Sequence, residues 1–133
     1  MKKVFVFFVA ALFAANLFAG EYPDVSIKEL KKAIDDKKVV LLDVNGSSRY
    51  AKAHIPGAHD YASVGKSLAK VLPKDKDALV VAYCGGPKCS AYKRAASAAE
   101  KLGYTNVKHL SAGISGWLKA GEKAEKAGKK KKG

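Results

Sequence analysis

The chain has 133 residues, two of them cysteines, and its 25 lysines and arginines against 12 acidic residues give a formal net charge of +13. This length suffices for one domain with a single core and excludes two. The positive charge suits anionic substrates, an anionic surface or an acidic partner protein. No aromatic residue is interleaved with the last lysines of the chain, so we do not expect a nucleic-acid binder.

The N-terminus has the pattern of a secretory signal peptide. Two lysines precede an apolar run over residues 4–18, and the small residues Ala19-Gly20 end it. We therefore expect a signal peptide over residues 1–19 and a mature protein that is periplasmic or secreted. An uncleaved membrane anchor is the alternative, although the apolar run is short for a membrane span.

The mature chain divides into a domain over residues 20–121 and a lysine-rich C-terminal tail over residues 122–133. In the tail, Glu122 and Glu125 are the only acids among the lysines. This composition predicts a solvated appendage outside the core. Contact of the tail with a membrane surface or with an acidic partner is the alternative.

Alternating helical and strand patterns run through the domain. Ser26 and Glu29 form a capping box, which starts a helix that ends at the charged residues 35–38. The apolar, β-branched run over residues 39–44 is typical of a strand covered on both faces, as in a parallel sheet. A turn then leads into a short helix through residues 49–52.

The middle of the domain continues this alternation. Residues 55–58 form a turn by composition, and a short amphipathic helix over residues 67–72 ends at Pro73. The second strongly apolar strand spans residues 79–83. It leads directly into a glycine-rich loop over residues 84–90.

The last third of the domain repeats the pattern. Ser90 is a candidate N-cap for a helix with an alanine-rich face, which stops at Gly103. A short strand over residues 107–110 and a helix over residues 114–120, with Trp117 facing inward, complete it. Strands that alternate with helices at this spacing predict an α/β fold, a small doubly wound sheet of mainly parallel strands with helices on both faces.

The glycine-rich loop is the candidate reactive site. A buried strand delivers Cys84 into a loop whose glycines let the backbone amides turn inward, and the next helix adds partial positive charge; both effects lower the pKa of a thiol. Ligands of such folds bind at the carboxyl ends of the strands, where Cys84 lies. Cys84 is therefore the candidate nucleophile. The candidate substrate- or anion-binding residues are Gly85, Gly86, Pro87, Lys88, Cys89 and Ser90, with the backbone amides of all but Pro87 as the donors.

The second cysteine has several interpretations. Two cysteines in an exported chain favour a disulfide, but a bridge between Cys84 and Cys89 closes so short a loop that it adds little stability. A reversible bridge, with Cys89 as a resolving thiol, suits this spacing better. Cys89 as a small packing residue at the helix start is the alternative. A metal site is disfavoured, because the sequence offers only two thiolates and no nearby histidine.

Five stretches of the chain within residues 25–121 form a recognisable series, at 41–44, 53–58, 80–84, 102–107 and 111–117. Taken in this order, they resemble the rhodanese-like (sulfurtransferase) domain. The resemblance implies a persulfide mechanism without cofactor or metal, in which Cys84 takes a sulfane sulfur from a donor and passes it to a thiophilic acceptor. Thiosulfate, polysulfide or another persulfide would serve as the donor.

The chain departs from the family pattern at two positions. Active members usually carry a basic residue at the sixth loop position, where this chain has Cys89; Lys88 and Arg94 are candidate sources of the missing charge. Asn45 stands where the family often has an arginine. We expect structural hydrogen-bonding roles for Asp43, at the end of a strand, and for His54, in the turn that the family shares.

The sequence therefore predicts an exported sulfurtransferase or sulfur carrier. One alternative is a thiol–disulfide redox protein that uses Cys84 and Cys89 as a dithiol, and another is a non-catalytic binding module with the same fold. Phosphatase chemistry is disfavoured, because Ser90 stands where that chemistry needs an arginine. The expected partners are a small sulfur donor and a thiol acceptor, with a protein acceptor or reductant as a further candidate and membrane contact only through the signal segment or the tail.

Overall fold

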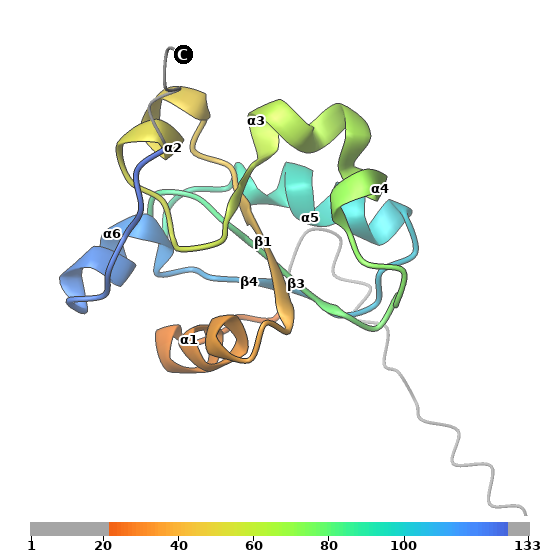
Figure 1. Ribbon diagram of the computed structural model, residues 1–133, viewed down its shortest axis with the longest axis horizontal. Coiled ribbons are helices and arrows are strands. Elements are labelled where there is room, and N and C mark those ends of the chain that lie inside the picture. The colour runs from red at the N-terminus through yellow and green to blue at the C-terminus, as the bar shows by residue number, and fades with distance from the viewer. Residues whose placement is uncertain (1–21, 128–133) are drawn as a thin grey trace, which may run out of the picture.

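A computed structural model describes residues 22–127 of the chain. Its centre is a sheet of four parallel strands in the order β2-β1-β3-β4 (Figure 1). The strands are β1 (Val39–Asp43), β2 (His59–Asp60), β3 (Leu79–Tyr83) and β4 (Val107–His109). The helices are α1 (Ile27–Asp35), α2 (Ser47–Lys52), α3 (Tyr61–Val64), α4 (Leu68–Val71), α5 (Tyr92–Lys101) and α6 (Gly113–Lys119), with a 3₁₀ turn, η1 (Gly65–Ser67).

The two central strands are the most extensively paired. β1 and β3 lie in register from Val39 opposite Leu79 to Asp43 opposite Tyr83. The chain adds β2 on the outer side of β1 and then crosses back to place β3 and β4 on the other side. The carboxyl ends of β1 and β3 therefore flank the point where the strand order reverses, which is where parallel α/β sheets bind ligands.

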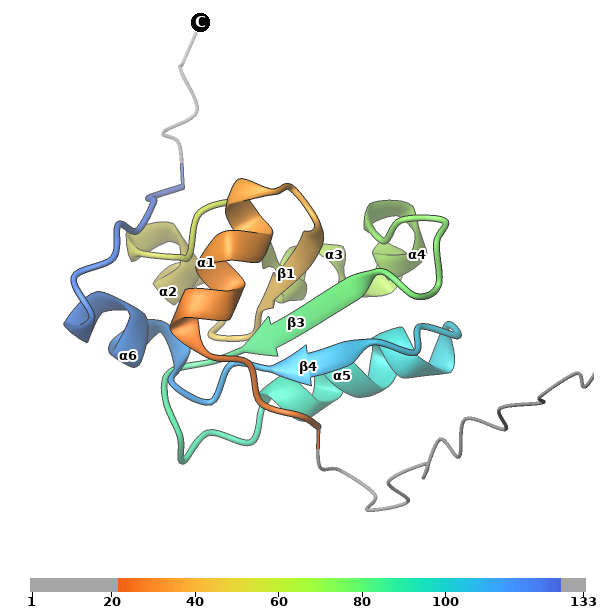
Figure 2. The same ribbon diagram turned by 90° about the horizontal axis from the view of Figure 1, so that it is seen from below.

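Both faces of the sheet are covered, because successive side chains of a strand point to opposite faces. On one face, Leu42, Val80 and Ala82 are buried in a cluster that includes apolar residues of α4 and α5. On the other face, Leu41 and Val81 join a cluster that includes residues of α1 and α6. Figure 2 shows α1 and α5 on opposite sides of the sheet. The predicted class, a parallel α/β sheet with helices on both faces, is confirmed.

Several local predictions are confirmed. Ser26 and Glu29 form the capping box at the start of α1, with the Glu29 backbone N–H donating to Ser26 Oγ at 3.1 Å and the Ser26 N–H donating to Glu29 Oε2 at 3.0 Å. The first two apolar runs form β1 and β3 as parallel neighbours. Trp117 points inward and is 3% exposed.

Other local predictions are wrong in detail. Ser90 does not cap α5 through its side chain; Ala91 occupies the cap position, and only the Ser90 carbonyl accepts the first turn's Lys93 N–H, at 3.1 Å. β2 and α3 were not predicted from the sequence, since elements of two and four residues are too short to show a periodicity. Asp60 joins these two elements by accepting the backbone N–H of Ala62 at 3.1 Å, which is an N-cap.

The predicted helix over residues 67–72 is split into η1 and the four-residue α4, and α6 begins one residue before the predicted start. The predicted strand over residues 107–110 ends at His109. These are shifts at element ends, where weak local patterns compete with packing.

The start of the C-terminal tail is not the free appendage that its composition predicts. Residues 122–127, here called the C-terminal strap, pair with the turn before β2: the backbone N–H groups of His54 and Glu125 each donate to the other's carbonyl, at 2.9 and 2.8 Å. Trp117 Nε1 donates to the Lys123 carbonyl at 2.9 Å, and Lys31 pairs with Glu122 at 3.0 Å. The expected signal peptide and residues 128–133 of the tail lie outside the described residues.

Within residues 22–127, no helix has the length and apolar character needed to cross a membrane.

Candidate active site

Cys84 lies directly after β3, in the centre of the sheet edge where the strand order reverses. Its side chain is 1% exposed, whereas Cys89 is only partly buried. The sulfurs of Cys84 and Cys89 are bonded to each other, with 6.3 Å between the Cα atoms. The structure therefore brings the candidate nucleophile and the candidate resolving thiol together as a disulfide across the loop.

The start of α6 holds the backbone of the cysteine loop. The N–H groups of Ile114 and Ser115 donate to the carbonyls of Cys84 and Gly85, both at 3.0 Å. Gly113 has φ +60°, and a Cβ atom there would lie 2.6 Å from the Cys84 carbonyl oxygen and from backbone atoms of the next two residues. Residues 113–115, here called the α6 clamp, thus fix the loop carbonyls, and only glycine fits at the closest approach.

Unlike its carbonyls, most backbone amides of the cysteine loop make no hydrogen bond within residues 22–127. Cys89 N–H donates to the Gly86 carbonyl at 3.1 Å and closes a turn. Within residues 22–127, the N–H groups of Gly85, Gly86, Lys88 and Ser90 donate to no protein acceptor. Of the five amides predicted as an anion cradle, four therefore keep their donors available, and the fifth is used to shape the loop.

The loop after β1 lies beside the cysteine loop and holds a buried carboxylate with its hydrogen-bond partners. Asp43 is fully buried and accepts the Asn45 backbone N–H at 2.8 Å and the Tyr83 hydroxyl at 2.7 Å. The Tyr83 oxygen in turn accepts the Ile55 N–H at 3.0 Å. Burial raises the pKa of Asp43 despite these hydrogen bonds, and burial together with the Asp43 charge raises the pKa of Tyr83. The predicted structural role of Asp43 is confirmed.

Asn45 lies closer to the cysteine loop than the sequence analysis foresaw. Its Oδ1 is 3.7 Å from the position of a Cβ atom built on Gly85. Its buried Nδ2 makes no hydrogen bond of normal geometry within the described residues, although the side-chain amide lowers the pKa of Asp43. The signal that identifies this neighbour is positional: Asn45 follows β1, and β1 pairs with the strand that carries Cys84.

The α6 clamp was also missed as part of the site. Residues 111–117 were predicted only as one of the stretches that resemble the family, with a helix starting after Gly113. The position of Gly113, shortly after a short predicted strand, is the signal that could have identified the clamp. A glycine at such a position often allows two backbone segments to approach closely.

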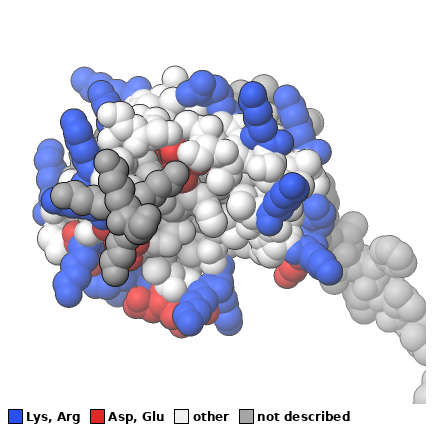
Figure 3. Space-filling view, turned by 45° about the horizontal axis from the view of Figure 1, so that its top comes forward, with Lys and Arg blue, Asp and Glu red and all other residues white. Residues whose placement is uncertain are grey.

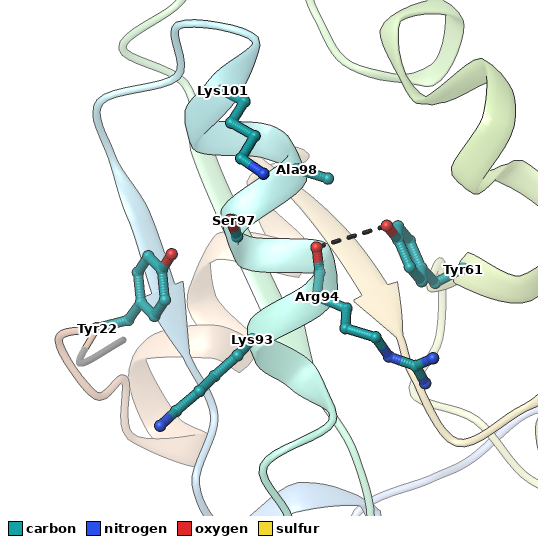
Figure 4. A pocket seen from close by; sticks show the side chains of 7 residues that line it. All are labelled: Tyr22, Tyr61, Lys93, Arg94, Ser97, Ala98 and Lys101. Atoms are coloured by element: carbon teal, nitrogen blue, oxygen red, sulfur yellow. Dashed lines mark hydrogen bonds between the residues drawn. The ribbon is translucent and has the colours of Figure 1, made fainter. Parts of the chain in front are cut away.

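The candidate basic residues do not contact the loop interior. Lys88 is exposed, and Arg94 lies on the outward face of α5, where its carbonyl accepts the Tyr61 hydroxyl at 3.4 Å (Figure 4). In the part of the chain that the structure describes, no hydrogen bond or ion pair joins the Arg94 guanidinium to the loop. The cysteine loop therefore offers unpaired amide donors, while the guanidinium of Arg94 is not joined to it.

His54 has the structural environment that the sequence analysis expected. It is 4% exposed, its ring stacks on Tyr50 with centroids 3.8 Å apart, and its Nδ1 lies 2.8 Å from the Tyr50 carbonyl. Its Nε2 lies 3.7 Å from a Glu125 carboxylate oxygen of the strap. These contacts connect the turn to the strap.

No group of three or more histidine, cysteine, aspartate or glutamate side chains within residues 22–127 is placed to hold a metal ion.

These features define an α/β domain that presents a cysteine, on an amide-rich loop, at the reversal point of a parallel sheet. The chain belongs to the family of rhodanese-like domains, which it matches over residues 26–120. This membership supports a sulfur-transfer role in general.

Two curated relatives and one solved structure illustrate the range of this family. The chain is 34% identical over 106 residues to the probable adenylyltransferase/sulfurtransferase MoeZ of Mycobacterium tuberculosis, covering 76% of this chain but only 26% of that protein. It is 31% identical over 108 residues to arsenate reductase 2.2 of Oryza sativa, covering 73% of this chain and 82% of that protein. The fold resembles thiosulfate sulfurtransferase from Pseudomonas aeruginosa, with a TM-score of 0.65, 24% identity, and coverage of 80% of this chain and 21% of that chain.

Proposed function

We propose that the protein is an exported sulfurtransferase or sulfur carrier, in which Cys84 carries sulfane sulfur as a persulfide. The observation that carries this proposal is the loop geometry: the α6 clamp holds the carbonyls of Cys84 and Gly85, while four loop amides keep free donors. An anionic persulfide needs convergent donors of this kind, and a rigid loop supplies them without reorganisation.

The first step is attack by the Cys84 thiolate on the sulfane sulfur of polysulfide, thiosulfate or another persulfide. A sulfur–sulfur bond forms at Cys84, and the donor's own bond to that sulfur breaks, with the electron pair leaving on the donor remnant. Transfer follows when an acceptor thiolate attacks the outer sulfur and releases the Cys84 thiolate. Lys88 and Arg94 would draw anionic donors to the site by their charge.

A second fate of the persulfide uses Cys89. Its thiolate attacks the inner sulfur on Cys84, the Cys84–Cys89 bond forms, and hydrosulfide leaves with the electron pair. The bond between these two sulfurs supports this step, because the step requires them to meet. An external thiol must then reduce the bridge before the next cycle.

Export and partners complete the proposal. The charged start and apolar run of residues 1–19 support a periplasmic or secreted location. In that compartment a small sulfur compound would be the donor, and a small thiol or a protein thiol would be the acceptor or reductant.

Mass spectrometry of the intact protein tests this function. The reduced wild type and its Cys84→Ser and Cys89→Ser variants are exposed to polysulfide or thiosulfate. We expect Cys89→Ser to gain about 32 Da per added sulfur and Cys84→Ser to gain nothing. Wild type should lose about 2 Da as the bridge forms and hydrosulfide is released. Absence of an adduct in Cys89→Ser would overturn the proposal and favour a redox protein or a binding module.

A second candidate function is arsenate reduction. It is favoured by the arsenate reductase from rice among the relatives and by the paired cysteines. Cys84 would displace hydroxide from arsenate, and Cys89 would then attack the Cys84 sulfur, so that the thiols are oxidised to a disulfide and arsenic(V) is reduced to arsenite. Ser90 in place of an arginine weakens oxyanion binding in this alternative. Arsenite released from the reduced wild type, but from neither cysteine variant, would establish it.

A further inference from the structure

The outward face of α5 carries a groove that lies outside the cysteine loop. It has a volume of about 590 Å³. Tyr22 and Tyr61 stand on opposite sides of the helix, and Lys93, Arg94 and Lys101 project from the helix itself (Figure 4). We call this surface the α5 groove. Its two tyrosines and three cations form a polar, positively charged surface rather than an apolar one.

The charge of the α5 groove is not neutralised by its surroundings. Lys93, Arg94 and Lys101 are exposed, and none of them forms an ion pair within residues 22–127. Burial, and after it the nearby Glu100, raises the pKa of the Tyr22 hydroxyl, so this acid lies beside the groove rather than in its lining. Figure 3 shows lysine and arginine side chains around much of the molecular outline. The residues that line the groove include three cations and no acid, which makes an anionic occupant the complementary one.

The α5 groove begins next to the disulfide. Lys93 and Arg94 lie in the first turn of α5, four and five residues after Cys89. Backbone hydrogen bonds from Lys93 to Ser90 and from Arg94 to Ala91, at 3.1 and 3.2 Å, join this turn to the end of the loop. A molecule that fills the groove and extends past the first turn of α5 toward the loop would therefore approach the Cys89 side of the bridge.

The two sulfurs of the bridge differ in access and in leaving ability. Cys84 is 1% exposed, whereas Cys89 is only partly buried, so a thiol from solvent meets Cys89 first. Attack at Cys89 expels the Cys84 thiolate, which the loop amides can stabilise, and a stabilised thiolate leaves faster. Attack at Cys84 would require entry into the core, because that side chain is 1% exposed.

We propose that an acidic protein carrying a dithiol docks on the α5 groove and reduces the Cys84–Cys89 bridge by attacking the sulfur of Cys89. This inference rests on the proposed function, in which the bridge is a product that must be reopened. The partner's thiolate bonds to Cys89 and releases the Cys84 thiolate. The partner's second thiolate then attacks the partner sulfur of this mixed disulfide and releases Cys89, which takes a proton; the partner becomes the disulfide and the bridge becomes two thiols.

Synthetic peptides test the docking step. The oxidised protein is reduced by an acidic peptide or by a neutral serine/glycine peptide, each with one cysteine. The rate constant of each peptide with the protein is divided by the rate constant of the same peptide with a small neutral disulfide. This ratio removes differences in thiol reactivity between the peptides. At low ionic strength we expect the acidic peptide to be favoured about tenfold, and salt near 1 M should remove the preference.

Matched charge reversals locate the effect. The variant Lys93→Glu with Arg94→Glu should lose the acidic preference, and its glutamates suit the first turn of a helix, so folding is retained. The control variant Lys28→Glu with Lys38→Glu changes the net charge equally at exposed sites by α1, on the other side of the sheet, and should keep most of the preference. Equal loss in both variants, or no preference in the wild type, would overturn the docking proposal.

The attacked sulfur is identified by rapid alkylation of the reacting mixture and peptide mapping. We expect the peptide on Cys89 and the alkyl group on Cys84; the reverse pattern would contradict the proposal. Persulfide formation is measured separately in Cys89→Ser, which has no bridge and an unchanged α5 groove. A failure of sulfur loading therefore refutes the proposed function without affecting the docking result, and the converse also holds.

Discussion

The loops after β1 and β3 leave the same edge of the sheet side by side, yet they place different polar groups there. After β1, the buried Asp43 carboxylate accepts hydrogen bonds from Asn45 and Tyr83, and the Tyr83 oxygen accepts the Ile55 N–H. After β3, the carbonyls of Cys84 and Gly85 are bonded to the α6 clamp, whereas four amides have no protein acceptor within residues 22–127. The first loop buries a carboxylate together with its partners, and the second fixes its carbonyls and leaves amide donors available.

This contrast shows how one sheet edge supplies both a support and a reactive loop. A buried polar group without a partner is costly, so a fold can leave donors unpaired only where other contacts hold the backbone in place. The α6 clamp is that contact here. We therefore expect changes in the clamp to alter both stability and thiol chemistry, and changes in the β1 loop to alter stability alone.

The largest effect is expected at the clamp. Gly113→Ala should cost about 3 kcal/mol of unfolding free energy, since it combines a strained positive φ with a Cβ atom 2.6 Å from loop backbone. It should also slow alkylation of Cys84 in a Cys89→Ser background. Urea unfolding and iodoacetamide kinetics measure the two effects.

Gly121→Ala is the matched control for this change. Gly121 also has a positive φ, +79°, but a Cβ atom there meets nothing within 4 Å. It should cost only about 1 kcal/mol and leave Cys84 reactivity unchanged. Equal costs at Gly113 and Gly121 would contradict the clamp.

The next largest effect is expected at Tyr83, the last residue of β3, whose hydroxyl supports the loop after β1. Tyr83→Phe removes the hydroxyl between Asp43 and the Ile55 N–H, which leaves two buried groups short of a partner and should cost about 2 kcal/mol. Alkylation of Cys84 in the Cys89→Ser background should keep its rate. Tyr61→Phe, which removes a half-buried hydroxyl, serves as the control and should cost below about 0.5 kcal/mol. A slower Cys84 in Tyr83→Phe would break the separation of the two loops.

A smaller, pH-dependent effect is expected at the end of β4, which leaves the same sheet edge. His109 stacks on Tyr92 with ring centroids 3.4 Å apart, and burial lowers the pKa of His109 below its usual 6.5, with the Lys93 charge adding to this and Asp24 opposing it. As the pH falls, the His109 imidazole therefore takes up a proton in the unfolded chain before it does so in the folded protein. The stability that neutral His109 contributes is complete above pH 6.5 and is lost as the pH falls from 6.5 through the pKa of His109 in the folded state.

The measurement compares unfolding free energies of wild type and His109→Phe between pH 7.5 and 5. Phenylalanine retains the ring stacking and removes the proton site. We expect the wild type to lose stability relative to His109→Phe as the solution is acidified. Parallel pH profiles for the two proteins would refute this role of His109.

The smallest effect is expected at Asn45. Asn45→Ala removes a side-chain nitrogen that makes no hydrogen bond of normal geometry within the described residues, so the unfolding free energy should change by less than about 0.5 kcal/mol. A loss above about 1 kcal/mol, measured by urea unfolding, would reveal a hydrogen bond from Asn45 and would make the two loops one network.

Much of the site was predictable because its signals are local. The apolar runs that become β1 and β3, the glycines after Cys84 and the order of the matching stretches are properties of neighbouring residues, and they predicted the parallel fold and the position of Cys84. Asn45 and the α6 clamp were missed because they meet the loop only across the sheet edge. No spacing within the sequence encodes the contact between Ile114 and the Cys84 carbonyl.

The sequence by itself determined the class of fold, the family and a cysteine at the carboxyl end of a central strand, because strand periodicity, capping and turn chemistry act over a few residues. Tertiary structure alone decided which loop groups remain available, since a carbonyl is occupied or free only once α6 packs against it. It also decided that residues 122–127 pair with the His54 turn although their composition suggests a solvated end. Hydrogen bonds to a distant part of the backbone offset the entropy cost of ordering such a segment. Local composition does not predict these hydrogen bonds, because their partners lie far away in the sequence.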